Sequence, residues 1–139
     1  MPYVGVIIEE SLKDTEVLRA VRICRTSQQP VTEWHRTPWL RQWTLHVVEI
    51  ADDAAERVAG RLAEAIDTTH GAWYADFKND QEHYVIFHGR IFRVRRGTPH
   101  AYDEAKAYGR GLGIPEHQLD FDTYGSRTCE GATPITDVG

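Results

Sequence analysis

The sequence is poor in cysteine and contains none of the common metal-binding motifs. Only two of its 139 residues are cysteines, Cys24 and Cys129, and they form no CxxC pair. The histidines match no HExxH or CxxC…H spacing, which argues against a zinc site. A chain of this size can bury a core without disulfides or metal. We therefore expect reduced cysteines, a cytoplasmic protein, and no metal or cofactor.

Long hydrophobic runs and an excess of positive charge are also missing. No apolar stretch approaches the roughly 20 residues that a membrane helix needs. The first residues, MPYVGVIIEE, lack the basic region of a signal peptide. The chain has 16 basic and 21 acidic residues, so its net charge is −5, whereas nucleic-acid binders usually carry a basic face. We expect neither a membrane nor a nucleic acid as a partner.

The hydrophobic pattern predicts an α+β fold. Short β-branched and aromatic runs predict strands at residues 3–10, 20–25, 42–50, 72–80 and 83–94, whereas residues 26–39 are expected to be mostly loop. Helices are expected at 52–67 and 98–115. Strand runs alternating with helices favour a two-layer sandwich, in which an antiparallel sheet carries two main helices on one face. A ferredoxin-like arrangement is the specific expectation.

The chain is expected to form one domain over residues 1–121, followed by a flexible tail at 122–139 that is short of large apolar residues. The helix at 52–67 has an apolar stripe that should face the core: Ala55, Val58, Ala59, Leu62 and Ile66. The dipeptide His88-Gly89 suits a two-residue hairpin turn, which would pair Val85 with Phe92 and Phe87 with Arg90.

Two registers are possible for the strand at 72–80, and they differ in which of its side chains point toward the core. We expect Trp73, Ala75 and Phe77 to share the core face with Val85, which requires an odd-length loop before His83. The opposite register would bury Asp76 and Lys78, at a cost of several kcal/mol unless they are paired. The chosen register places a polar set together on the outer face: His46, Tyr74, Asp76, Lys78, Tyr84 and Arg93.

This outer face is the predicted functional surface. His46 or Asp76 would transfer protons as the catalytic residues. The other members of the face would bind the substrate, and the loop before residues 42–50 would form one wall of the site. The cations would hold an anionic group, and the tyrosine hydroxyls would form hydrogen bonds. The expected substrate-binding residues are Arg36, Trp39, Tyr74, Lys78, Tyr84 and Arg93. Nucleophilic catalysis has little support because the sequence contains no GxSxG motif.

The segment EWHRTPWLRQW contains three tryptophans, Trp34, Trp39 and Trp43, interleaved with Arg36 and Arg41. Packing in a core or a corner is the simplest interpretation. An aromatic pocket for a planar or anionic ligand also fits, since arginine stacks on indole rings and pairs with carboxylates or phosphates. Stacking on single-stranded nucleic acid is a further alternative. The sequence leaves these alternatives open.

These features favour a small-molecule-binding protein, with acid–base catalysis on a small anionic metabolite as its expected activity. The alternative is a non-catalytic regulatory domain, in which the same face forms a homodimer or a partner interface. The segments TPWLRQWTLHVVEI, WYADFKND and GIPEHQLDF together resemble a family of small, conserved prokaryotic proteins of unknown function. The resemblance spans about residues 3–121 and implies no activity, cofactor or catalytic residue.

Overall fold

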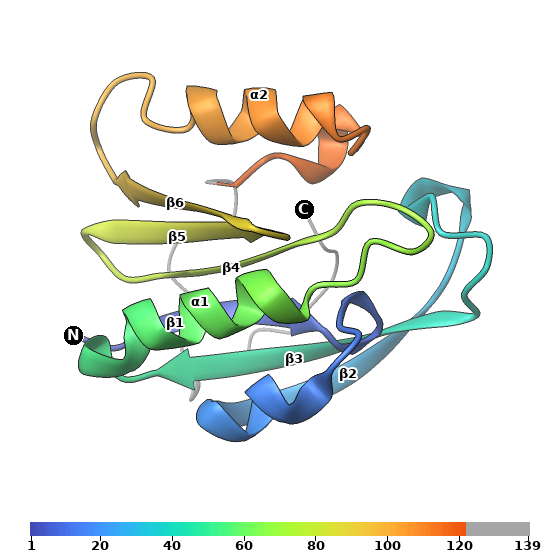
Figure 1. The fold of residues 1–139 in the computed structure, drawn as a ribbon, viewed down its shortest axis with the longest axis horizontal. Helices are drawn as coiled ribbons and strands as arrows, with labels where there is room; N and C mark the ends of the chain where they lie inside the picture. Colours follow the sequence, from blue (N-terminus) through green and yellow to red (C-terminus); the bar gives the residue numbers. More distant parts are fainter. Residues whose placement is uncertain (122–139) are drawn as a thin grey trace.

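A six-stranded antiparallel sheet organises the protein, whose computed structural model describes residues 1–121 (Figure 1). The strands run in the order β2-β3-β1-β4-β5-β6. Their bounds are β1 Tyr3–Ile8, β2 Arg22–Pro30, β3 Gln42–Ile50, β4 Tyr74–Lys78, β5 Glu82–Phe87 and β6 Arg90–Arg95. The α+β class is thereby confirmed, and the predicted tail at 122–139 lies outside the described residues.

Two α-helices and five short 3-10 helices connect the strands of the described part. The α-helices are α1 (Ala55–Ala65) and α2 (Asp103–Gly111). The 3-10 helices are η1 (Glu9–Ser11), η2 (Thr15–Ala20), η3 (Glu33–His35), η4 (Asp52–Ala54) and η5 (Glu116–Gln118). All adjacent strand pairs in the described sheet are antiparallel, and this order does not confirm a ferredoxin-like arrangement.

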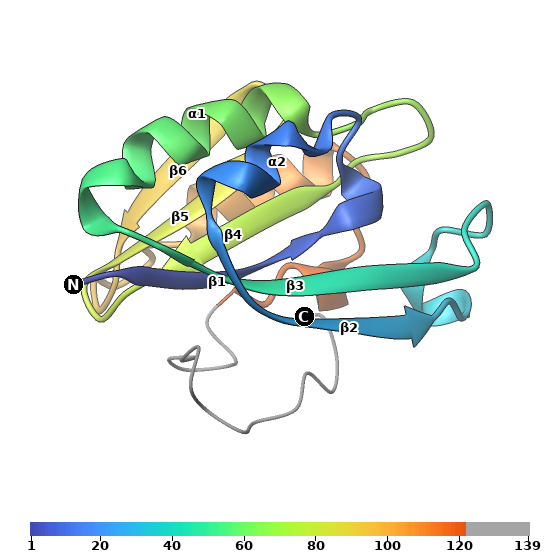
Figure 2. The ribbon, with the colours of Figure 1, turned by 90° about the horizontal axis from the view of Figure 1, so that it is seen from below.

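The two α-helices pack against opposite faces of β5. Helix α1 shares one core cluster with Tyr84 and Ile86, whereas Ala105 of α2 shares the other cluster with Val85 and Phe87. Successive residues of a strand point to opposite faces, so the expectation of both helices on one face is wrong for α2. Figure 1 shows β5 and β6 between the helices, and Figure 2 shows α1 above the sheet with α2 behind it.

The predicted register of β4 is also wrong. Phe77 lies opposite Tyr84, and Asp76 lies opposite Val85. Directly opposed residues share a face, so Phe77 faces α1 while Asp76 and Val85 face α2. Because α2 and residues 114–121 cover that second face, β4 and β5 are buried on both sides and their sequences carry no single core stripe.

The turn between β4 and β5 determines this register. Lys78 pairs with His83, which leaves an even number of residues between the paired positions. Asn79 holds the turn: its side-chain oxygen accepts hydrogen bonds from the amides of Gln81 at 2.9 Å and Glu82 at 2.8 Å. Its own amide donates to the Glu82 carbonyl at 3.0 Å. An asparagine that binds nearby backbone in this way is a common turn former.

Two local predictions are confirmed. The apolar stripe of the first helix is at most 1 % exposed at each predicted position: Ala55, Val58, Ala59, Leu62 and Ile66. The hairpin between β5 and β6 has the expected pairs, Val85 with Phe92 and Phe87 with Arg90. Gly89 adopts a φ of 70° at the turn, a value that glycine reaches without steric cost.

Strand β2 is longer than the sequence predicts. It continues through a polar run to Pro30 and pairs with β3 over its whole length, with a bulge between Ile23 and Arg25. Cys24 lies in this bulge and is disulfide-bonded, so the expectation of a reduced thiol is wrong at this position. Cys129 lies outside the described residues. None of the helices in the described part is both long and apolar enough to cross a membrane.

Candidate functional site

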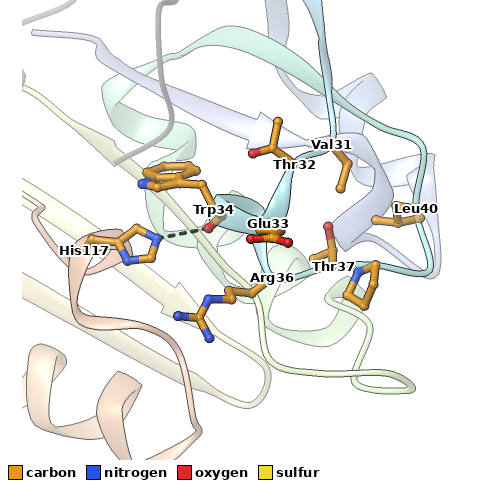
Figure 3. A pocket seen from close by; sticks show the side chains of 9 residues that line it. Val31, Thr32, Glu33, Trp34, Arg36, Thr37, Leu40 and His117 are labelled. Carbon is orange, nitrogen blue, oxygen red and sulfur yellow. Dashed lines mark hydrogen bonds between the residues drawn. The ribbon is translucent and has the colours of Figure 1, made fainter.

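A pocket of about 840 Å³ opens beside η3, where the chain passes from β2 to β3. Nine residues line it: Val31, Thr32, Glu33, Trp34, Arg36, Thr37, Pro38, Leu40 and His117. Figure 3 shows Trp34, Arg36 and His117 toward one end and Thr37 and Leu40 toward the other. The first end carries aromatic and cationic groups, while the second is largely apolar.

The three neighbouring tryptophans have three different roles. Trp43 is 2 % exposed and belongs to the core, where its indole N–H donates to the Thr37 hydroxyl at 2.9 Å. Trp34 and Trp39 are 38 % and 41 % exposed. Trp39 stacks on His70 at 5.3 Å, outside the pocket lining, and Trp34 forms part of the wall. Of the three alternatives for this segment, core packing holds for Trp43, and Trp34 lines a pocket, whereas binding of a ligand or of single-stranded nucleic acid stays a prediction.

His35 fixes the shape of the η3 turn and is neutral. The Thr32 backbone amide donates to its Nδ1 atom at 2.9 Å, so Nδ1 carries no proton. The proton is on Nε2, which lies 3.1 Å from the side-chain oxygen of Gln29 and donates to it. Burial lowers the pKa of His35 below its ordinary value. Its ring packs edge-on against Trp43 at 4.4 Å, so it acts as a structural residue.

The far wall of the pocket comes from η5, more than 80 residues along the chain. His117 lies 3.0 Å from the Trp34 carbonyl oxygen through Nε2. A carbonyl only accepts, so Nε2 donates and carries the proton. The Gln118 amide donates to the carbonyls of Trp34 and His35, each at 3.2 Å. These contacts hold the His117 ring 4.7 Å from the Trp34 ring.

Arg36 has an unusual backbone conformation. It ends η3 with φ 62° and ψ 26°, in the left-handed region that non-glycine residues seldom adopt. Such positions cluster at ligand sites because the surrounding structure must impose the conformation. The amide of Arg36 donates to the Glu33 carbonyl at 3.2 Å. This turn presents the guanidinium and the Glu33 carboxylate on one pocket.

The structure divides the rest of the predicted site between the two faces of the sheet. Tyr74, Asp76 and Lys78 face α2, whereas Tyr84 and its cross-strand partner Arg93 face α1. Directly paired residues share a face, and Tyr84 is connected in this way through Phe77 and Gly5 to Val48. His46 lies two residues before Val48 on β3, so it also faces α1. The single outer surface that the sequence predicts does not form. Arg36 and Trp39 lie apart from both sets, between β2 and β3.

Asp76 belongs to a buried polar array on the α2 face. Its carboxylate lies 2.6 Å from Nε2 of His83, a residue with no exposed surface. Nδ1 of His83 lies 2.9 Å from the Tyr102 hydroxyl. Tyr74 donates to the backbone carbonyl of Gln118. These bonds pair the Asp76 carboxylate, which the predicted register kept out of the core, and they attach Tyr102 and Gln118 of the C-terminal part of the domain to the sheet.

Tyr84 and Arg93 form a second polar group, on the α1 face. Arg93 donates to both oxygens of Glu82, at 2.7 and 2.8 Å, and lies 5.4 Å from the Tyr84 ring centre. Burial raises the pKa of Tyr84. Burial, followed by the Glu82 charge, raises the pKa of Tyr3 to about 12. Tyr84 is 3 % exposed, whereas the Arg93 side chain is 53 % exposed and bound to Glu82, so the two residues do not form an open site together.

His46 has partners other than Asp76. Its Nε2 lies 2.9 Å from the Glu9 carboxylate and its Nδ1 lies 2.8 Å from the Thr26 hydroxyl. The next residue of η1, Glu10, accepts from the Thr44 amide at 2.6 Å and from the Thr44 hydroxyl at 2.7 Å. His46 thus remains a candidate acid–base residue in a different group of side chains.

Sequence reasoning missed His117, Gln118 and Thr26. The two η5 residues follow a predicted helix at great sequence distance from η3, and Thr26 lies in a polar run that was expected to be loop.

Within the described residues, no group of three or more His, Cys, Asp or Glu side chains could hold a metal ion. Comparisons with protein families, curated proteins and solved structures gave no match.

Proposed function

We propose that the protein binds a small, planar, anionic molecule in the pocket beside η3. One observation carries the proposal: an indole, a guanidinium and an imidazole, from Trp34, Arg36 and His117, line one pocket of about 840 Å³. Pockets for small ligands usually measure about 300–1,000 Å³ and combine apolar walls with a few polar groups. The hydrogen bonds from η5 to η3 support a wall that exists before the ligand arrives.

Each lining group suits one part of such a ligand. The half-exposed Trp34 ring offers a stacking surface for a planar ring. The Arg36 guanidinium matches a carboxylate, because its N–H groups can donate two parallel hydrogen bonds. Leu40 and the neighbouring apolar groups receive the remainder of the ring. The Glu33 carboxylate in the same lining disfavours a second negative charge, so a monoanion fits best.

Binding can be tested with indole-3-carboxylate as the probe and uncharged indole as its partner. The carboxylate should raise the melting temperature of the full chain, because a ligand that binds only the native state stabilises it. Trp34→Ala and Arg36→Gln should each weaken its affinity by about tenfold or more, as one lost charged or stacking contact of about 1.4 kcal/mol implies. Trp39→Ala is the matched control, since Trp39 is equally exposed but does not line the pocket.

The same titration can overturn the proposal. Equal affinity of the wild type for indole and indole-3-carboxylate would show that the pocket does not select an anion. A loss of binding in Trp39→Ala with none in Trp34→Ala would move the site to the His70 side of the loop. No response to any of the probes at millimolar concentration, measured by amide chemical shifts, would contradict the assigned ligand class.

Several sequence-based expectations remain proposals. One of them is acid–base catalysis on an anionic metabolite, for which no substrate is assigned. The alternative is a regulatory domain that forms a homodimer, and light scattering on the purified chain tests for the dimer directly. A cytoplasmic location also stays a proposal. The disulfide at Cys24 weakens it, because stable disulfides are uncommon in reducing compartments.

A further inference from the structure

A hydroxyl, an imidazole and a carboxylate meet in series where β2, β3 and η1 adjoin. Thr26 of β2 lies directly opposite His46 of β3, and its Oγ1 is 2.8 Å from His46 Nδ1. Glu9 of η1 reaches the other ring nitrogen, with Oε1 2.9 Å from Nε2. The three groups belong to three different elements, so the sheet pairing and the turn after β1 bring them together.

The chemistry of the three groups determines where the protons lie. The Glu9 carboxylate can only accept, so His46 donates through Nε2–H. Nδ1 of the neutral ring then has its lone pair available, and the Thr26 hydroxyl donates to it. The result is a hydroxyl whose proton is already bonded to a base, and a base that a carboxylate orients. This arrangement is the general signature of an activated nucleophile.

Exposure separates the roles of the three residues. The side chain of His46 is 8 % exposed and that of Glu9 is 46 % exposed, so packing holds the imidazole in place. Thr26 is exposed to solvent. A nucleophile must be reachable while its base is held in position, and this array meets both conditions. The Asp76–His83–Tyr102 array is more enclosed, because His83 has no exposed surface and Tyr102 is only partly exposed, whereas Thr26 is exposed.

We propose that Thr26 is the nucleophile of a carboxylic-ester hydrolase site on this face of the sheet. Thr26 Oγ1 attacks the acyl carbon while its proton passes to Nδ1 of His46. The bond to the alcohol oxygen breaks, and that oxygen takes the proton from His46. Water then attacks the acyl-threonine and gives one proton to Nδ1 of His46. The bond between the acyl carbon and Thr26 Oγ1 breaks, Oγ1 takes that proton back from His46, and the products are a carboxylic acid and an alcohol.

The surrounding charges select the class of ester. Two carboxylates of η1, Glu9 and Glu10, lie beside the array, and Glu10 accepts two hydrogen bonds from Thr44. An anionic acyl group would be repelled there. Uncharged or cationic esters are therefore the expected substrates. This preference is the opposite of that of the η3 pocket, so the two proposals stand independently.

The full chain should hydrolyse 4-nitrophenyl acetate faster than it hydrolyses the anionic mono-4-nitrophenyl succinate. Thr26→Val keeps a β-branched side chain on the strand but removes the hydroxyl, and it should lower the enzymatic rate by at least about 100-fold, because the covalent route loses its nucleophile. Thr26→Ser should retain the activity. Thr69→Val is the matched control, because the Thr69 hydroxyl donates to the Asp67 carboxylate at 2.6 Å and not to an imidazole.

Covalent labelling supplies a second readout. An uncharged fluorophosphonate should modify Thr26, as identified by peptide mass spectrometry. Glu9→Gln, which alters a positioning residue, should slow this labelling at an unchanged melting temperature. Equal ester hydrolysis by the wild type and a folded Thr26→Val variant would overturn the proposal, as would labelling of the chain at sites other than Thr26. If the anionic ester is the better substrate, the assigned ester class is wrong.

Discussion

Replacing Thr37 by valine tests the link between the core and the η3 pocket. The Thr37 hydroxyl accepts the indole N–H of Trp43 at 2.9 Å, and the two residues are 7 % and 2 % exposed. Valine has nearly the same volume but offers no acceptor. The indole N–H would then be buried without a partner, which costs about 1–3 kcal/mol. We expect the free energy of unfolding to fall by this amount, without a change of fold.

Urea denaturation followed by tryptophan fluorescence measures the effect, and an unchanged dependence on urea would show that the unfolded surface is the same. Thr37→Ser keeps the hydroxyl and should lose no more than about 0.8 kcal/mol, the value of one buried methylene-sized group. In a Trp43→Phe background the donor is gone, so the added cost of Thr37→Val should shrink. A loss below about 0.5 kcal/mol, or an equal loss in both backgrounds, would refute the reasoning.

Four further predictions concern the fold and its titrating groups. Leu62→Ala should cost about 2–5 kcal/mol in a chemical denaturation assay, since Leu62 has no exposed surface; a loss under about 0.5 kcal/mol would contradict its place on the core face of α1. Gly5→Ala should cost more than about 3 kcal/mol, because the new Cβ would lie 1.9 Å from the Asp76 carbonyl oxygen; normal stability would disprove this close approach of β1 and β4. Folding lowers the pKa of His35 below its ordinary value of about 6.5. At pH values below about 6.5 the unfolded chain therefore binds more protons than the folded chain, so stability should fall as the pH drops; His35→Asn should flatten that part of a plot of melting temperature against pH. Peptide mapping should find Cys24 alkylated only after reduction, and alkylation of the unreduced, denatured chain would show a free thiol.

The parts of the fold that could be predicted are those that local pattern determines. The apolar stripe around Leu62 predicts a helix and its buried face, and the His88-Gly89 dipeptide predicts both a turn and its cross-strand pairs. In each case the residues that decide the structure lie within a few positions of one another. These predictions are confirmed because nothing distant competes with them.

The register of β4 could not be predicted, because it depends on whether the number of turn residues is odd or even. The turn that Asn79 holds leaves an even number of residues between Lys78 and His83, so every side chain of β4 lies on the face opposite to the predicted one. The alternation rule also assumes one solvated face, and β5 has none. The predicted functional surface failed with the register, since it needed Asp76 and Tyr84 on the same side.

Strand β2 shows a second limit of sequence reasoning. Its polar residues, Thr26 to Pro30, resemble a loop in composition, but pairing with β3 makes them a strand. Tertiary pairing overrides weak local preference in such segments. His46 was identified as a candidate from its place on a strand, but its partners Glu9 and Thr26 come from separate elements and could be recognised only in three dimensions.

The hydrogen bonds from η5 to η3 also set an order of events during synthesis. His117 follows Trp34 by 83 residues, which a ribosome adds in about 4–17 s at roughly 5–20 residues per second. Until then the η3 turn lacks its second wall, and the Trp34 ring lacks its contact with the His117 ring. The ligand proposed for the η3 pocket could therefore use both walls only after His117 has been synthesised, and not during the early steps of folding.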